Sequence, residues 1–299
     1  MDGSAYDVVF VGSYTKDTVI SSGRSRVVDG GGFNYGAHAA VLMGLRTAAV
    51  TRLSADDAHV VKTLVGLGVD VFPTYTPTST HLTLYYPTSN VDERVITVMQ
   101  TAGSFMPDQV RGLTATAFIV NTSLRGEAGE DVILELKGKT ALLAGDAQGF
   151  IRAIAANGTL AHTPWPEKKQ VLAHFDILKT DAVEAEALTG LGDMREAATE
   201  LAGWGPKEIV LTHRNGLLVL AAGVFYEVPW CPKELIGRSG RGDTCLAAYV
   251  GKRLAASPED ATVWAAALTS LKMEAEGPIK GTLANVEEMI RQIGDTPNR

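Results

Sequence analysis

The feature that most constrains the fold of this chain is a regular alternation of short apolar runs and helical segments after residue 115. Strands are expected at residues 117–121, 140–144, 175–178 and 208–212, with helices between them at 130–137, 167–174 and 182–188. Parallel strands need long crossovers, usually helices, so this alternation predicts a parallel sheet with helices on both faces. Two further apolar runs, 217–220 and 224–228, predict an antiparallel hairpin at one edge.

The first hundred residues extend this sheet and add a second, smaller one. Apolar runs at 7–11, 48–51 and 69–72 predict strands, and helices are expected at 37–45 and 55–67. Two β-rich runs, 82–87 and 94–99, bracket a polar turn segment and predict a hairpin, with residues 18–28 as its partner. The prediction is one doubly wound α/β domain over residues 1–299, with a small projecting sheet.

Composition narrows the class of protein. The 299 residues are 45% hydrophobic and carry a net charge of −7, with no cluster of basic residues, so nucleic acid is not an expected partner.

No apolar stretch approaches the ~20 residues of a membrane span, and residues 1–4 lack the features of a signal peptide. Two cysteines without metal or disulfide spacing, Cys231 and Cys245, favour a cytoplasmic location. The six histidines are scattered, so no zinc site is predicted.

One segment, Gly237-Arg238-Ser239-Gly240-Arg241-Gly242-Asp243, combines glycines, an acid and the start of a helix that continues into an apolar run. Glycines let backbone N–H groups turn toward a ligand, and a helix N-terminus favours negative charge, so the segment is suited to hold a phosphate group. Asp243 then lies where a base could deprotonate an attacking hydroxyl. Helix capping by Asp243 is the alternative interpretation. The segment is not a Walker A loop.

A second glycine-rich segment, Gly30-Gly31-Gly32-Phe33-Asn34-Tyr35-Gly36-Ala37, precedes a helix that ends at Gly44. Its spacing does not match the dinucleotide fingerprint, and no acid-ended second strand follows. The remaining interpretations are a flexible turn and a surface that a small molecule can approach closely.

In their order along the chain, these segments resemble the ribokinase-like (PfkB-type) carbohydrate kinases, whose signature is D-T-x-G-A-G-D. Gly240-Arg241-Gly242-Asp243 matches the G-A-G-D core, whereas Gly237 replaces the leading Asp and Arg241 replaces Ala. The resemblance implies that the amides from Gly240 to Gly242 form an anion hole and that Asp243 is the catalytic base. Arg241 either adds charge beside the phosphates or points to solvent.

The same resemblance implies a site for the acceptor near the N-terminal glycines. Gly31, Gly32, Asn34 and Tyr35 would contact the substrate, although Tyr35 stands where the family often has Asn. Asp17, shortly after the first strand, would accept hydrogen bonds from substrate hydroxyls; it is equally consistent with a turn residue.

Two further segments resemble the family's donor and metal motifs. Lys179-Thr180-Asp181-Ala182-Val183-Glu184 resembles N-x-x-E, which organises Mg²⁺ largely through water, with Asp181 in place of Asn and Lys179 beside the donor. Acids in a first helical turn are also expected from capping alone. Thr212, Arg214 and Gly216 resemble the nucleotide-binding T-x-G-x-x-G loop, with Arg214 where Gly is usual, but a tight Asn-Gly turn explains residues 215–216 equally well.

Arg152 is a further candidate for the site. It follows Gly145-Asp146-Ala147-Gln148-Gly149, at the end of a predicted strand where doubly wound sheets place their ligands. Arg152 is expected to pair either with a phosphate or with Asp146.

The resemblance extends from Gly12 to about Gly277. It implies a kinase that uses ATP and Mg²⁺ to phosphorylate a small sugar or polyol under a lid built from about residues 13–29 and 78–101. The motif variants are most similar to the inositol kinase branch. Ribose or another sugar, a nucleoside, and a non-catalytic role in binding a sugar or nucleotide stay open, as does a homodimer paired through the lid.

Overall fold

The computed structural model describes residues 5–21, 23–88 and 94–295. Its main sheet contains nine strands: β1 (Tyr6–Val11), β4 (Thr47–Leu53), β5 (Asp70–Tyr75), β8 (Ala115–Val120), β9 (Leu142–Asp146), β12 (Ile177–Asp181), β13 (Glu208–Thr212), β14 (Gly216–Ala221) and β15 (Val224–Pro229). Their spatial order is β15-β14-β13-β12-β9-β8-β1-β4-β5. All pairs from β13 to β5 are parallel, and β14 and β15 add the predicted antiparallel hairpin at one edge.

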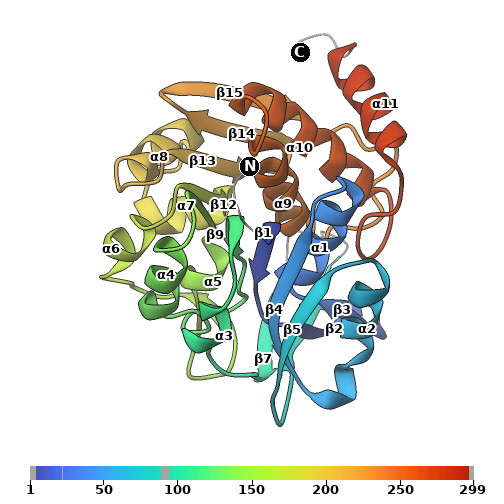
Figure 1. The fold of residues 1–299 in the computed structure, drawn as a ribbon, viewed down its shortest axis with the longest axis vertical. Coiled ribbons are helices and arrows are strands. Elements are labelled where there is room, and N and C mark those ends of the chain that lie inside the picture. The colour runs from blue at the N-terminus through green and yellow to red at the C-terminus, as the bar shows by residue number, and fades with distance from the viewer. Residues whose placement is uncertain (1–4, 22, 89–93, 296–299) are drawn as a thin grey trace.

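Helices cover both faces of this sheet (Figure 1). One face carries α1 (Gly32–Leu42), α2 (His59–Gly66), α9 (Arg241–Arg253), α10 (Pro258–Met273) and α11 (Leu283–Gly294). The other carries α3 (Asp108–Arg111), α4 (Glu130–Lys137), α5 (Gln148–Ile151), α6 (Lys168–Leu172), α7 (Ala182–Thr189) and α8 (Met194–Ala202). Strand β1 shows why two cores form: Val8 and Phe10 point to one, Val9 and Val11 to the other. The predicted fold class is confirmed.

The order of the strands creates a crevice beside β1. After β1 the chain builds β4 and β5 on one side, then returns to build β8 and the remaining strands on the other. The connections that leave the carboxyl ends of β1 and β8 therefore diverge, which is where doubly wound sheets bind ligands. Gly12 follows β1 and Asn121 follows β8 at this point.

A second sheet covers one end of this crevice. It consists of β2 (Thr15–Ser21), β3 (Arg24–Gly30), β6 (Thr80–Tyr86) and β7 (Val95–Gln100), in the order β3-β2-β6-β7. The predicted hairpin is confirmed as the antiparallel pair β6–β7, whereas the single partner predicted at 18–28 is the hairpin β2–β3. Residues 22 and 89–93 of the predicted lid, like residues 1–4, lie outside the described residues.

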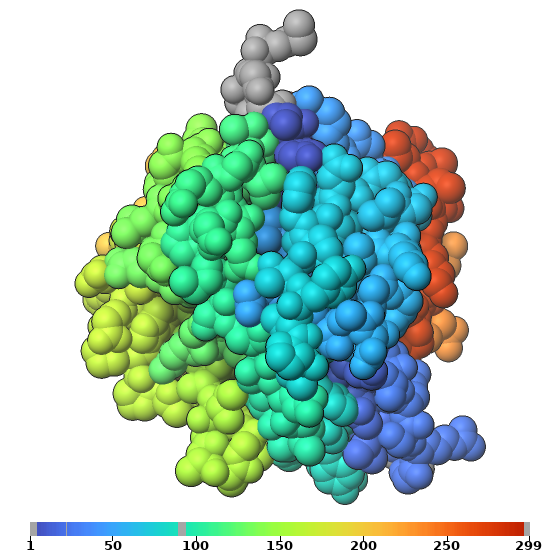
Figure 2. Space-filling model, turned by 60° about the horizontal axis from the view of Figure 1, so that its bottom comes forward, coloured from blue at the N-terminus to red at the C-terminus, as the bar shows by residue number. Residues whose placement is uncertain are grey.

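The lid also touches a short hairpin, β10 (Arg152–Ile154) and β11 (Leu160–His162), through a bridge between Thr97 and Thr159. Figure 2 shows the resulting edge of the molecule, where the blue and teal lid segments lie beside the yellow-green one. The lid strands and the β10–β11 hairpin, which are far apart in sequence, thus lie side by side at this edge.

Several elements differ from the sequence predictions. Helix α1 begins at Gly32, five residues before the predicted start, because close packing against β1 outweighs the low helix propensity of Gly and Asn. The predicted helix 55–67 is divided into a 3₁₀ turn, Ala55–Asp57, and α2. Helices α8 and α11 were not predicted. No helix in the described ranges is long and apolar enough to cross a membrane.

Gly36 in α1 tests this close packing. A Cβ at Gly36 would lie 2.4 Å from Cε1 of Phe10. We expect Gly36→Ala to lower the free energy of unfolding by about 1–3 kcal/mol, although Ala normally favours a helix. The control is Gly66→Ala in α2, where a Cβ meets nothing within 4 Å and about 0.5 kcal/mol of stabilisation is expected. Urea titration measures both, and equal effects would contradict the packing argument.

Candidate active site

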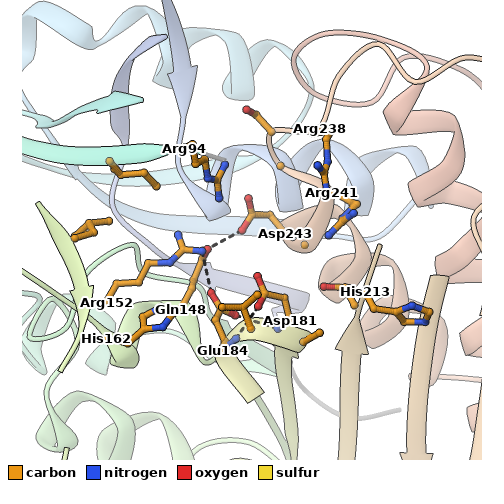
Figure 3. A pocket seen from close by; sticks show the side chains of 18 of the residues that line it. Arg94, Gln148, Arg152, His162, Asp181, Glu184, His213, Arg238, Arg241 and Asp243 are labelled. Atoms are coloured by element: carbon orange, nitrogen blue, oxygen red, sulfur yellow. Dashed lines mark hydrogen bonds and ion pairs between the residues drawn. The ribbon is translucent and has the colours of Figure 1, made fainter. Parts of the chain in front are cut away.

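A cavity of about 700 Å³ lies where the lid, the β10–β11 hairpin and the start of α9 meet the carboxyl ends of the strands. Figure 3 shows side chains from each of these regions pointing into it. Among the described lining residues, the cations Arg94, Arg152, Lys179, Arg214, Arg238 and Arg241 face the carboxylates Asp181, Glu184 and Asp243. The excess of positive charge suits an anionic ligand.

The N-terminus of α9 forms one wall of this cavity. Gly240 is its N-cap residue and has a left-handed backbone with φ 77°. A Cβ at Gly240 would lie 2.1 Å from the ring of Tyr35, and one at Gly242 would lie 2.6 Å from Nζ of Lys179. The glycines thus bring the helix start against a ring on one side and an ammonium on the other. The first N–H groups of a helix have no partner within it, so this end can bind a phosphate together with Lys179.

Asp243 lies in the first turn of α9 and faces the cavity, so the structure places it where the sequence predicted. Its Oδ1 accepts a hydrogen bond of 3.2 Å from Nε2 of Gln148 (Figure 3). The same Nε2 also donates to Oδ1 of Asn121 at 3.1 Å. This bond orients one carboxylate oxygen and leaves the other for a further donor. In Figure 3, Arg238 and Arg241 lie on the opposite side of Asp243 from Gln148.

A buried network of charges supports the floor of the cavity. Nζ of Lys179 lies 3.0 Å from Oδ2 of Asp146 and 4.0 Å from Oε2 of Glu184, and Nη2 of Arg152 lies 2.9 Å from Oε1 of Glu184. Burial raises the pKa of Asp146, and Lys179 opposes that rise. Burial would also raise the pKa of Glu184, but Lys179 and Arg152 lower it. Arg152 thus pairs with Glu184 and not with Asp146, while its contact with a phosphate stays a prediction.

Asp181 and Glu184 form a capping box at the start of α7. Asp181 Oδ1 accepts from the N–H of Glu184 at 2.8 Å, and Glu184 Oε2 accepts from the N–H of Asp181 at 3.0 Å. Since Glu184 is 1% exposed and bonded to Arg152, it does not fit direct coordination of a metal. Asp181 is partly exposed in the cavity and fits a Mg²⁺ that arrives with donor phosphates and keeps most of its waters. No group of three or more metal-ligating side chains occurs among the described residues.

Five of the predicted acceptor residues are not among the residues that line this cavity: Asp17, Gly31, Gly32, Asn34 and Tyr35. Asp17 is on β2, and its Oδ1 is buried without a hydrogen-bond partner among the described residues. Cβ atoms at Gly30 and Gly32 would lie 2.5 Å from Oδ2 of Asp17 and 2.2 Å from Cγ of Asn121. Glycine is therefore required at these positions because the side chains of Asp17 and Asn121 occupy the space of a Cβ atom. The sequence analysis did not predict this packing role.

Asn34 and Tyr35 are both buried in the first turns of α1. Nδ2 of Asn34 donates to the carbonyl of Asp29 at 3.4 Å, and the Tyr35 ring packs against Gly240. Gly31, at φ 97°, is the N-cap residue of α1. The glycine segment is therefore the beginning of a helix that abuts the start of α9.

The predicted donor loop is only partly in place. Thr212 and Arg214 line the cavity, but Gly216 is not among its lining residues. A Cβ at Gly216 would lie 2.4 Å from the carbonyl oxygen of Val228, so pairing with β15 explains this glycine. The geometry thus favours the hairpin interpretation for Gly216.

The sequence analysis missed four residues of the site: Asn121, Gln148, Arg94 and Arg238. Asn121 and Gln148 each lie just after the carboxyl end of a strand, β8 and β9 respectively. Their positions after these strands are the sequence signal that could have identified them. Arg238 lies in the segment 237–243 that the sequence analysis identified, but it was given no role there. Arg94 is remote in sequence from Asp243, and only the tertiary structure brings the two residues to one cavity.

A helix N-terminus in a cationic cavity, with an oriented carboxylate beside it, is the arrangement of a phosphoryl-transfer enzyme. Residues 7–284 match the model of the pfkB family carbohydrate kinases, and the chain belongs to this family. It is thus a kinase of the ribokinase fold, as the sequence predicted.

Two solved structures and one curated protein are similar to most of the chain. A pyrophosphate-dependent kinase in the ribokinase family, complexed with a pyrophosphate analog and myo-inositol, is 33% identical, with a TM-score of 0.87 over 94% of this chain and 99% of that one. A sulfate complex of a pyrophosphate-dependent kinase in the ribokinase family is 35% identical, with the same TM-score and coverage. The cytidine kinase of Thermococcus kodakarensis is 26% identical over 82% of this chain and 87% of its own length.

The buried carboxyl of Asp17 leads to a prediction about stability. Burial raises its pKa to about 6, although a hydrogen bond from Thr15 opposes the rise. An unfolded chain holds this proton only below ~3.9, so the native state binds more protons between about pH 4 and 6 and loses stability as pH rises through that window.

We therefore expect Asp17→Asn to raise the free energy of unfolding by about 2 kcal/mol at pH 8 and to have no such effect near pH 4. Urea unfolding of both proteins across this pH range measures the difference. A variant that is less stable than the wild type at pH 8 would contradict this account of the site.

Proposed function

We propose that this kinase transfers a phosphoryl group from pyrophosphate to a hydroxyl of inositol or a closely related cyclic polyol. The observation that carries the proposal is the N-terminus of α9, where open N–H groups, Lys179 and Asp243 converge on one cavity. This is the geometry that holds a phosphate and deprotonates the hydroxyl that attacks it.

In the proposed reaction, Asp243 takes the proton of the acceptor hydroxyl. The hydroxyl oxygen forms a bond to the nearer phosphorus, and the bridging P–O bond breaks with its electron pair leaving on the second phosphate. Gln148 holds the carboxylate of Asp243 toward the acceptor, and Lys179 and the amides of α9 stabilise negative charge on the transferred group. A Mg²⁺ at Asp181, bound with the donor, would neutralise part of the phosphate charge.

The cations at the far side of Asp243 support pyrophosphate as the donor. Arg238 and Arg241 lie on that side, and Arg214 lines the same cavity in place of the glycine usual in the nucleotide loop. Arginine is suited to bind phosphate oxygens in pairs. The similar inositol-bound kinase is also pyrophosphate-dependent. ATP, which the sequence motifs favoured, is the second candidate donor.

The polar surroundings of Asp17 support a polyol acceptor. Oδ1 of Asp17 and Nδ2 of Asn121 are buried without hydrogen-bond partners among the described residues, an acceptor and a donor that hydroxyl groups would satisfy. The myo-inositol in the similar structure agrees with this chemistry. The likeness to a cytidine kinase makes nucleosides the second candidate class.

A matrix of donors and acceptors tests the proposal. Pyrophosphate and ATP, each with Mg²⁺, are incubated with myo-inositol, ribose, fructose and cytidine, and the products are resolved by ³¹P NMR. We expect a phosphomonoester of inositol with pyrophosphate and slower turnover with ATP. If only cytidine is phosphorylated, the proposed acceptor is wrong and the acceptor is a nucleoside. If ATP is used in preference to pyrophosphate, the proposed donor is wrong.

Asp243→Asn tests the catalytic base. We expect kcat to fall by about two or more orders of magnitude, because the amide cannot take the hydroxyl proton. Asp260→Asn is a matched control: Asp260 occupies the third position of α10, as Asp243 does of α9, and accepts from the hydroxyl of its N-cap residue Ser257. Steady-state kinetics of both variants separate catalysis from helix capping, since a capping role predicts similar small effects.

A further inference from the structure

Lys272, in the last turn of α10, is a buried cation that the reaction described above does not use. Its side chain is 1% exposed, and its Nζ donates a hydrogen bond of 3.0 Å to the carbonyl of Gly237. Nζ also lies 5.6 Å from the centre of the Tyr35 ring, within range of a cation–π interaction. Burying an ammonium group costs free energy, so the position of Lys272 requires an explanation.

Gly237 begins the loop that leads into the phosphate-binding end of α9. Its N–H donates 2.9 Å to the carbonyl of Met273, and a Cβ at this position would lie 2.1 Å from the carbonyl oxygen of Ala275. With the bond from Lys272, both polar groups of Gly237 are attached to the end of α10. A larger residue at 237 would displace the loop.

Tyr35 connects Lys272 to the other end of the same loop. Its ring contacts Lys272 and also fills the space where Gly240, the N-cap residue of α9, would carry a Cβ. The ammonium therefore restrains the loop directly at Gly237 and, through Tyr35, at Gly240. Loop 237–240 thus joins three helices, α1, α9 and α10.

We propose that Lys272 is a positioning residue for phosphoryl transfer, whose ammonium holds loop 237–240 and Tyr35 in the arrangement that forms the anion site. Its positive charge also lies behind the loop that receives the negatively charged donor. The inference rests on the proposed function, because the loop must bind and transfer a phosphate for its position to matter.

The surroundings of Lys272 make the effect depend on pH. Burial lowers the pKa of its ammonium to about 8, while the charges of Glu276 and Asp243 oppose that shift. Glu276 is itself paired with Arg26 at 3.0 Å, and the ring of Tyr35 lies 5.6 Å from Nζ of Lys272. The positioning role requires the protonated form, so kcat/KM should fall as pH rises through about 8.

Stability should change in the opposite direction. The folded pKa lies below the ~10.4 of an exposed lysine, so the unfolded chain binds more protons between these values. Relative to a variant without the ammonium, the wild type gains stability as pH rises through this window while it loses activity. A residue with only a structural role would not separate the two quantities.

The test compares the wild type with Lys272→Met, which keeps an unbranched side chain one atom shorter and removes the charge. We expect kcat at pH 7 to fall about 10- to 100-fold, the scale of a misplaced catalytic group, and the decline of kcat/KM near pH 8 to disappear. The matched control is Lys252→Met, which removes an ammonium from the ring of Trp264 between α9 and α10 and should leave kcat and its pH dependence unchanged.

Lys272→Ala with ethylammonium chloride provides a second arm, because a small amine can occupy the vacated space and should restore part of kcat at pH 7. The proposal is overturned if Lys272→Met keeps the wild-type kcat, or if its kcat/KM still declines near pH 8. It is also overturned if ethylammonium restores none of the kcat lost in a folded Lys272→Ala protein. Wild-type turnover in the same assay reports separately on the proposed function. If the wild type is inactive, calorimetric titration with inorganic pyrophosphate still decides: affinity unchanged by Lys272→Met overturns the role.

Discussion

The close approach of the α9 N-terminus to its neighbours is the constraint on which the site depends. Gly240 meets the ring of Tyr35, and Gly242 meets the ammonium of Lys179, at distances that no Cβ would permit. These contacts bring the start of α1 and the start of α9 together at the carboxyl-terminal part of β12. The helix start faces a cavity there, so its unpaired N–H groups become a binding site instead of a solvated end.

The buried charges are arranged around this point and stabilise it as a set. Lys179 is held by Asp146 and Glu184, and Glu184 also holds Arg152, so each ion has a partner of opposite sign. Removing one partner from such a network leaves an uncompensated buried charge and costs several kcal/mol. These charges are therefore paired before the donor arrives, and such preorganisation lowers the reorganisation that transfer of a charged group would otherwise require.

Much of this structure was predictable from the sequence. The alternation of strands and helices after residue 115 predicted the parallel sheet, because the two elements differ in the period of their apolar residues. Asp243 was identified from the glycines before it. The start of α1 was predicted too late, since Gly32 and Asn34 have low helix propensity and only their packing partners override it. Gln148 and Lys272 were not assigned roles, because their partners Asp243 and Gly237 are remote in sequence.

The central claim is that the start of α9 binds the phosphate that Asp243 helps to transfer. A crystal structure with myo-inositol and methylenediphosphonate, a pyrophosphate analogue that cannot be cleaved at its bridge, tests it most directly. The account predicts phosphonate oxygens within hydrogen-bond distance of the Gly242 amide and of Nζ of Lys179, with a hydroxyl of inositol facing Asp243. An analogue bound elsewhere in the cavity, with those groups unoccupied, would contradict it.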